Sequence, residues 1–513
     1  MRVTRGLGRG LARTASHGKP AGSAAGTGAG TDSGSNSGTG AGSAVGTGAG
    51  SDAGTGAGSD AGSDAVSNSG HSAGAASVGA DSVGADSAVA ATPTPSLSRR
   101  RLLGLAGASV AGLGLGVAGD RVALVAGATE GSASASTVFL FYGSHQAGIV
   151  TPAQDRLHFA AFDVSAGVTR AELIELLQDW TVAAAAMCAG ADIGEYGAVS
   201  GPYDAPPEDT GEAQGLPTAG LTITFGFGPT LFETADGVDR FGIAARRPAD
   251  LTPLPHFPGD DLDAGRSDGD LCIQACSNDP QVAVHAIRNL SRIAFGRAAL
   301  RWSQLGFGRT SSTSTTQATP RNLFGFKDGT ANIKAEEPAV VTDQVWVSAG
   351  DGPAWLAGGS YLVTRRIRMT IETWDRTILR EQEAVFGRTK GAGAPLSGGT
   401  EFSEPNFTLA GRENEPLIGA AAHVRLAHPT QNGGMKLLRR GYNFVDGNDD
   451  LGRLEAGLFF ISFQRSPAQF TAVQLNLAKH DALNEYIRHV GSALFAVPAG
   501  ASAGSYVGAA LFA

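Results

Sequence analysis

Asp328 is the residue of this chain whose surroundings most suggest chemistry. It lies in residues 322–330 (NLFGFKDGT), where aromatic side chains and glycines surround a single carboxylate with no second acid beside it. Such a loop is rigid and close-packed, and it can present one aspartate to a small pocket, where a carboxylate is able to carry a proton. Asp-Gly is also among the commonest turn dipeptides, so this pair alone decides nothing.

Two further motifs follow later in the chain. His423 stands within residues 421–429 (AAHVRLAHP), and Arg439 and Arg440 stand within residues 437–442 (LLRRGY). Neutral imidazole is a common axial ligand of haem iron, and a guanidinium stays charged at any working pH. An isolated arginine pair is most simply a solvated positive patch. The order of the three motifs along the chain is what favours a shared site.

Together these motifs resemble the signatures of the dye-decolorizing (DyP-type) haem peroxidases, which read GxxDG, AHxRLAxP and LRRGY. The resemblance implies that Asp328 is the distal proton carrier and that His423 is the axial ligand of the haem iron. It also implies that Arg439 is the distal arginine, which binds the cofactor and stabilises charge on the departing peroxide oxygen. Arg440 stays open as the alternative, because spacing does not separate the two.

The same resemblance implies further contacts to the cofactor. Glu485 is predicted to accept the second ring N–H of His423, which would raise the basicity of the imidazole; a surface glutamate is the rival interpretation. Phe326, Gly329 and Thr330 are predicted to contact the cofactor from the Asp328 loop. The chain has no CxxCH motif for covalent attachment, so we expect haem b to be held non-covalently.

The start of the globular part, residues 141–149 (FYGSHQAGI), resembles the exported EfeB-like branch of the family, and the resemblance covers 137–513. It implies a peroxidase that reduces hydrogen peroxide and oxidises small phenolic or dye-like aromatic donors through compound I. The alternative is a deferrochelatase that releases iron from haem and works with components of a bacterial iron-uptake system. A second alternative is a non-enzymatic haem carrier, which would need only His423 and an apolar pocket. A homo-oligomer stays open.

The elements that position these residues alternate between strands and helices. Thr169 with Glu172 forms a capping-box pattern at the start of a helix. The order strand, helix, strand, strand, helix favours a ferredoxin-like unit, and a similar order recurs after the Asp328 loop. We therefore predict an α+β fold of two ferredoxin-like halves, 137–310 and 311–513, with antiparallel sheets and helices enclosing a haem pocket. The expected strands are 138–142, 157–164, 221–228, 270–276, 360–371 and 454–464, and the expected helices begin at 169 and cover 279–290, 375–386 and 475–490.

The first 136 residues have a different character. Residues 1–95 are mostly a Gly/Ala/Ser-rich extension that can bury almost nothing, so we predict that they are disordered. Residues 96–136 contain Arg99, Arg100 and Arg101 ahead of a short glycine-rich apolar run, a pattern typical of a twin-arginine export signal. The run is shorter than the roughly 20 apolar residues that span a bilayer. We expect export by the twin-arginine route and a periplasmic or other extracytoplasmic location.

Composition excludes other classes of protein. The net charge is −9 and no basic face is evident, so a nucleic-acid partner is excluded. Three cysteines, Cys188, Cys272 and Cys276, are too few for a disulfide framework in a protein of this size. Cys272 and Cys276 could pair after export, but two buried small hydrophobic residues are the simpler interpretation.

Overall fold

The computed structural model of the protein describes residues 137–513. The predicted disordered extension (1–95) and the predicted twin-arginine segment (96–136) lie outside the described residues. Within 137–513, no helix is both long enough and apolar enough to cross a membrane. Cys188, Cys272 and Cys276 are buried and unbonded to one another.

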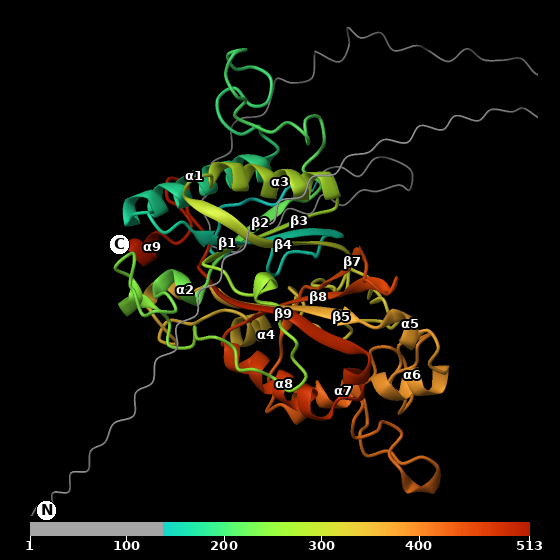
Figure 1. Ribbon diagram of the computed structural model, residues 1–513. Coiled ribbons are helices and arrows are strands. Elements are labelled where there is room, and N and C mark those ends of the chain that lie inside the picture. Colours follow the sequence, from blue (N-terminus) through green and yellow to red (C-terminus); the bar gives the residue numbers. More distant parts are fainter. Residues whose placement is uncertain (1–136) are drawn as a thin grey trace, which may run out of the picture. The chain divides into compact units, whose positions relative to one another are not determined.

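The first half of the described chain folds as a four-stranded antiparallel sheet with two helices. The strand order is β2-β3-β1-β4, and the helices α1 and α3 lie together on one face of the sheet (Figure 1). This order of strands is that of a ferredoxin-like βαββαβ unit. The elements are β1 (Arg156–Val164), α1 (Arg170–Ala189), β2 (Thr222–Phe227), α2 (Pro229–Phe232), β3 (Leu271–Ser277), α3 (Pro280–Ile293) and β4 (Ala298–Arg309).

Local sequence signals explain where the two long helices of this half begin and how they dock. Thr169 and Glu172 form the predicted capping box at the start of α1, and the Asp279 side chain accepts from the first turn of α3. The indole Nε1 of Trp180 on α1 donates to the carbonyl of Leu290 on α3 at 2.8 Å. This hydrogen bond lies in the apolar layer between the helices and the sheet. It fixes the two helices side by side.

The second half repeats the arrangement. Its strand order is β9-β5-β8-β7, with the two-residue β6 beside β8, and α8 packs on β5 and β8 (Figure 1). The elements are α4 (Pro338–Gln344), β5 (Ser360–Met369), α5 (Ile371–Trp374), α6 (Leu379–Phe386), α7 (His423–Leu426), β6 (Leu438–Arg439), β7 (Tyr442–Asn448), β8 (Leu454–Gln464), α8 (Pro467–His480), β9 (Ile487–Val497) and α9 (Ala509–Phe512).

The two half-sheets join into one ring of strands. Phe227 of β2 pairs with Ala496 of β9, β4 pairs with β7 at two positions, and β5 pairs with β8. Inside this closed sheet, the aromatic rings of Phe459 and Phe495 lie at centroid distances of 5.4 and 6.2 Å from the ring of Phe159. The predicted α+β fold with ferredoxin-like halves is confirmed, and the closed ring is an addition that the sequence did not indicate.

Two predicted elements are wrong. Residues 138–142 have no strand pairing within the described chain, although Phe141 is buried in the core. The predicted helix 475–490 ends at His480, because Asp481 takes an extended backbone conformation and its side chain accepts from the Leu483 N–H at the start of a short 3-10 turn. The chain then enters β9 at Ile487. This difference changes the site, as described below.

Candidate active site

The loop that carries Asp328 is held by close packing on both sides. Before Asp328, the rings of Phe324 and Phe326 are about 1% exposed and lie in an apolar cluster with Trp374. After it, Gly329 has φ +84°, and a Cβ there would lie 2.8 Å from the Cα of Ser311. A side chain at this position would meet both a backbone penalty and a steric clash. The loop therefore has little freedom to move the Asp328 carboxylate.

Asp328 faces Arg439 across the site. The guanidinium Nη1 of Arg439 donates to Oδ1 of Asp328 at 2.8 Å, and Asn322 Nδ2 lies 3.3 Å from Oδ2. Arg439 is placed by β6, and its backbone N–H donates to Asn332 Oδ1 at 2.7 Å. The side chains of Asp328 and Arg439 are 15% and 28% exposed. The pair is thus partly exposed, yet held by neighbours on both sides.

Arg440 points the other way. Its side chain is fully buried, where it donates to the carbonyl of Thr151 at 2.6 Å and also binds Gln154 Oε1. These partners belong to the first half of the molecule. Arg440 therefore fastens one half to the other, and of the two arginines only Arg439 reaches Asp328 among the described residues.

His423 begins α7 and is held by a carboxylate. Its Nδ1 lies 2.5 Å from Oδ2 of Asp481, whose side chain is 2% exposed and whose other oxygen accepts from the Leu483 N–H at 2.9 Å. Burial alone would lower the pKa of His423, but the Asp481 carboxylate outweighs burial and leaves that pKa above its ordinary value. With Nδ1–H donated to Asp481, the lone pair stays on Nε2, which has no hydrogen-bond partner within 137–513.

The prediction that Glu485 accepts the N–H of His423 is wrong. Asp481 makes this hydrogen bond, and Glu485 is exposed on the 3-10 turn that follows. Glu485 was assigned by resemblance within an expected helix, whereas the helix ends at His480 and the turn there brings the Asp481 carboxylate to His423. The signal that could have indicated Asp481 was its place as an N-cap residue ahead of a short turn.

The proximal and distal groups face one region. The charges of both Asp328 and Arg439 act on the His423 imidazole. Phe386 connects the two sides: its ring stacks on Phe326 at a centroid distance of 4.0 Å and lies 6.0 Å from the His423 ring. Sequence reasoning did not single out Phe386, since an aromatic residue at the end of a helix is more often part of the core.

These residues fit a haem. Nε2 of His423 would bind the iron, and the ring of Phe386 would supply an apolar wall. Haem also carries two propionate carboxylates, which bind cations. Two cations lie near Arg439, and their hydrogen bonds go to groups other than carboxylates. Arg388 donates to the carbonyls of Gly393 and Glu401, and Lys334 binds the carbonyl and hydroxyl of Ser312.

The charge of Arg439 acts on both of these cations. Burial lowers the pKa of Lys334, and the Arg439 charge lowers it further. Burial also lowers the pKa of Arg388, again with a contribution from Arg439. An added carboxylate at this place would oppose both shifts, because its charge favours the protonated forms of Lys334 and Arg388.

The other residues predicted to touch the cofactor are placed as follows. Phe326 lies inside the apolar cluster, with its ring against Phe386. Gly329 packs on Ser311, and the Thr330 hydroxyl lies 3.3 Å from Oε1 of Glu401. Their contact with a cofactor stays a prediction.

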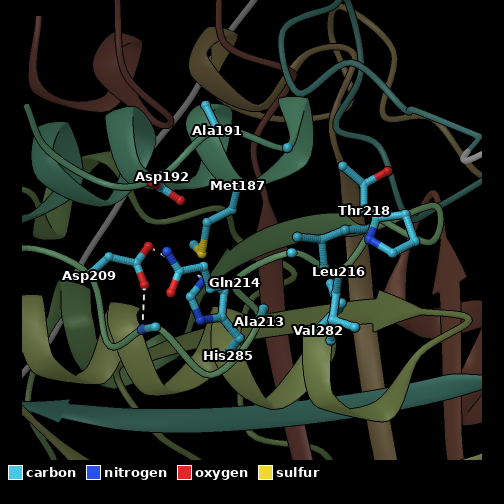
Figure 2. Close-up of a pocket in the computed structure, with 15 residues that line it drawn as sticks. Met187, Ala191, Asp192, Asp209, Ala213, Gln214, Leu216, Thr218, Val282 and His285 are labelled. Atoms are coloured by element: carbon cyan, nitrogen blue, oxygen red, sulfur yellow. Dashed lines mark hydrogen bonds and ion pairs between the residues drawn. The ribbon is translucent and has the colours of Figure 1, made fainter. Parts of the chain in front are cut away.

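A second, small cavity lies in the first half of the molecule. Figure 2 shows it between the end of α1 and the start of α3, with Asp209 and His285 turned toward each other. Asp209 Oδ2 lies 3.5 Å from His285 Nε2. The cavity is about 80 Å³, whereas cofactor sites measure about 300–1,000 Å³. It does not include Asp328, His423 or Arg439.

An imidazole bound to a carboxylate and an Asp–Arg pair near it, in a protein of two ferredoxin-like halves, are the features expected of a haem peroxidase. Two family models agree. The model described as "Dyp-type peroxidase, N-terminal" matches residues 146–308, and "Dyp-type peroxidase, C-terminal" matches 319–502. The chain belongs to the Dyp-type peroxidase family.

Curated relatives and solved structures are consistent with this assignment. The chain is 39% identical over 380 residues to a deferrochelatase of Yersinia pseudotuberculosis, covering 72% of this chain and 84% of the relative. It is 36% identical over 421 residues to the deferrochelatase of Escherichia coli K12, covering 81% and 96%. Ferric DtpA from Streptomyces lividans is 41% identical with a TM-score of 0.67, covering 73% of this chain and 97% of that one. A DyP-type peroxidase from Cellulomonas bogoriensis is 40% identical with a TM-score of 0.65, covering 73% and 98%.

Proposed function

We propose that this enzyme uses non-covalent haem b, bound through His423, to reduce hydrogen peroxide and oxidise phenolic or dye-like donors. The observation that carries the proposal is the Asp328–Arg439 pair, joined at 2.8 Å and close enough to His423 for both charges to act on the imidazole. A protein that merely carried haem would need the imidazole but not this pair. Since the chain also belongs to an enzyme family, the carrier alternative has no support.

The distal pair supplies the acid–base chemistry that peroxide cleavage requires. When bound, the haem iron supplies the site at which peroxide is activated. The Asp328 carboxylate would take a proton from one peroxide oxygen and return it to the other, the departing one. The Arg439 guanidinium would stabilise negative charge on the departing oxygen, because it stays protonated and is already oriented by β6.

On the other side, Asp481 sets the state of His423. The carboxylate accepts the Nδ1 proton, so it fixes both the tautomer and the orientation of the ring. A hydrogen-bonded carboxylate also makes Nε2 a stronger donor to a metal. The enzyme thus combines a basic proximal ligand with a charged distal pair.

Replacing Asp328 by alanine tests the proposal. We expect Asp328→Ala to bind haem normally and to react with peroxide at least ~100-fold more slowly, in the range for a lost acid–base group. Stopped-flow absorbance at the Soret band gives the rate constant, and the band height gives the haem content. Asp351→Ala is the matched control, because Asp351 also pairs with an arginine, Arg465, but at an exposed site. Equal rates for Asp328→Ala and wild type would contradict the assigned role.

A second function is favoured by the relatives named deferrochelatase. The same site would then take haem as a substrate and release its iron within an iron-uptake system. Anaerobic incubation with haem, followed by fluorescence detection of metal-free protoporphyrin, tests this activity. Protoporphyrin formed by wild type but not by His423→Ala would support it, and no protoporphyrin from either would leave the peroxidase proposal alone.

We further propose that the protein is exported by the twin-arginine route to an extracytoplasmic location, on the basis of residues 98–104. Replacing Arg99 and Arg100 by lysine keeps the charge and removes the arginine pair. The variant should accumulate in the cytoplasm on cell fractionation. Normal export of the variant would contradict the proposal.

A further inference from the structure

A long connection between α6 and α7 lies against the catalytic loop. We call residues 387–421 the strap; Figure 1 shows it in orange beside α6 and α7. Arg321, at the base of the Asp328 loop, donates to the strap carbonyls of Lys390 and Gly391, each at 2.7 Å. A Cβ on Gly325 would lie 2.8 Å from Cε of Lys390. The strap and the loop are therefore in close contact.

Glu401 of the strap contacts this loop on both sides of Asp328. Its carboxylate forms an ion pair with Lys327 Nζ and lies 3.3 Å from the hydroxyl of Thr330. Lys327 precedes Asp328 and Thr330 follows two residues later. The Glu401 side chain is 11% exposed. A single half-buried carboxylate thus binds side chains before and after the catalytic residue.

Glu401 is itself fixed by the strap. Arg388 Nη1 donates to the carbonyl of Glu401 at 2.9 Å and to that of Gly393 at 2.7 Å. Gly393 allows close approach, because a Cβ there would lie 2.8 Å from Cδ of Lys327. Burial would raise the pKa of Glu401, but hydrogen bonds, led by that from Lys327, outweigh it and leave the pKa lowered. Glu401 is therefore charged at neutral pH.

We propose that Glu401 is a positioning residue for the peroxide reaction, acting through Lys327 and Thr330 to hold Asp328 in place opposite Arg439. The inference rests on the proposed function and extends it to the strap. A fixed loop matters because a displacement of about 1 Å in a catalytic group can cost ~100-fold in rate. A carboxylate that merely fastened the strap would affect stability and leave the reaction of the folded enzyme unchanged.

Glu401→Gln is the first variant, since glutamine keeps the size and one acceptor oxygen but loses the charge. We expect a ~10- to 100-fold lower rate constant for the reaction of the haem-loaded enzyme with peroxide. Hydrogen–deuterium exchange in peptides covering 321–332 should be faster by at least ~10-fold, in the apoprotein as well as the loaded enzyme. Haem content should be unchanged.

Two further variants and one control complete the test. Lys327→Met removes the partner, and the double variant Lys327→Met/Glu401→Gln should be no slower than the slower single variant, because both changes remove one interaction. Glu404→Gln is the control: Glu404 lies on the same strap, is 80% exposed and binds His428 at 3.0 Å. It should match wild type in rate and exchange. If Glu401→Gln does not fold, Thr330→Val removes one contact with less disturbance.

Each outcome decides the proposal. A slower reaction together with faster exchange in 321–332 supports it. Faster exchange with an unchanged rate overturns it, because Glu401 would then be a structural fastener. A slower reaction without faster exchange also overturns it, since the effect would not pass through the loop. Wild-type enzyme that fails to react with peroxide would overturn the proposed peroxidase function instead, while the exchange of the apoprotein would still test the anchoring by Glu401.

Discussion

The hydrogen bond between His423 and Asp481 leads to a prediction about haem binding. Replacing Asp481 by asparagine removes the charge that makes Nε2 a strong donor. We expect Asp481→Asn to lose haem roughly 10- to 100-fold faster than wild type, the usual effect of losing such a contact. Transfer of haem to an excess of apomyoglobin measures the rate. Glu485→Gln, which changes an exposed carboxylate on the following turn, should behave as wild type. Faster haem loss from Glu485→Gln than from Asp481→Asn would show that Glu485, and not Asp481, supports His423.

The arginine pair gives a second prediction for single residues. Arg439→Leu should lower the rate of the peroxide reaction by ~100-fold or more, in the range for loss of one charge-stabilising donor, with little change in stability. Arg440→Leu should do the opposite, because it removes the donor to the buried Oε1 of Gln154 and one of the two donors to the Thr151 carbonyl, at a cost of about 1–3 kcal/mol for the unsatisfied oxygen. Urea unfolding and stopped-flow rates separate the two effects. A stable but inactive Arg440→Leu would contradict this division of roles.

Site residues could be predicted from the sequence where a motif contains them. They could not be predicted where their position depends on the direction that the backbone takes after a turn. Asp328, His423 and Arg439 stand in recognisable motifs, and the structure brings them into one region. Asp481 was missed because its role depends on the turn that ends α8, and that turn was expected to be helix. Glu401 lies more than 70 residues from Lys327, and no local pattern in the sequence predicts a contact at such a distance.

At the level of elements, the Asp328 loop depends on a glycine. Gly329→Ala should lower both stability and rate, since φ +84° costs about 1–2 kcal/mol for an alanine and the added Cβ would lie 2.8 Å from the Cα of Ser311. Gly350→Ala is the matched control, because Gly350 has φ +103° with no atom within 4 Å of the added Cβ. Both variants pay the backbone penalty, but only Gly329→Ala should slow the peroxide reaction. Equal rates in the two variants would show that the loop tolerates the displacement.

Elements with strong local signals were predicted well. The capping box at Thr169 and the strand 454–464 agree with α1 and β8. The strand expected at 138–142 failed because its apolar run packs in the core without a neighbouring strand to pair with. Apolar runs predict burial, and pairing depends on partners elsewhere in the chain.

For the whole molecule, the duplicated order of elements predicted two halves, but no sequence pattern indicated how they join. Few backbone pairings connect the half-sheets directly, with one between β2 and β9 and two between β4 and β7. Side chains add to these, most clearly Arg440, which directly follows β6 and binds Thr151 and Gln154. Asp328, His423, Arg439 and Asp481 all lie in the second half, so the first half acts on the site through Arg440, the neighbour of Arg439, whose side chain it binds.

The acid sensitivity of the whole fold follows from a buried histidine on β9. Burial, with a contribution from the Arg365 charge, lowers the pKa of His489 to about 3, and its side chain is 8% exposed. Below pH 6.5 the unfolded chain binds a proton at this residue that the folded protein excludes until about pH 3. Stability is therefore fully present above pH 6.5 and falls with pH through that window, by about 1.4 kcal/mol per pH unit.

His489→Gln removes this titration. Urea unfolding at pH 7.5 and 5.0 should show that the wild type loses about 2 kcal/mol more than the variant between the two conditions. His158, whose pKa burial lowers to about 4, destabilises both proteins equally and cancels in the comparison. His480→Gln is the control, because the His480 side chain is exposed and should keep the wild-type pH dependence. The same loss in wild type and His489→Gln would mean that His489 takes up its proton without unfolding, and that the acid sensitivity of the ring of strands arises elsewhere.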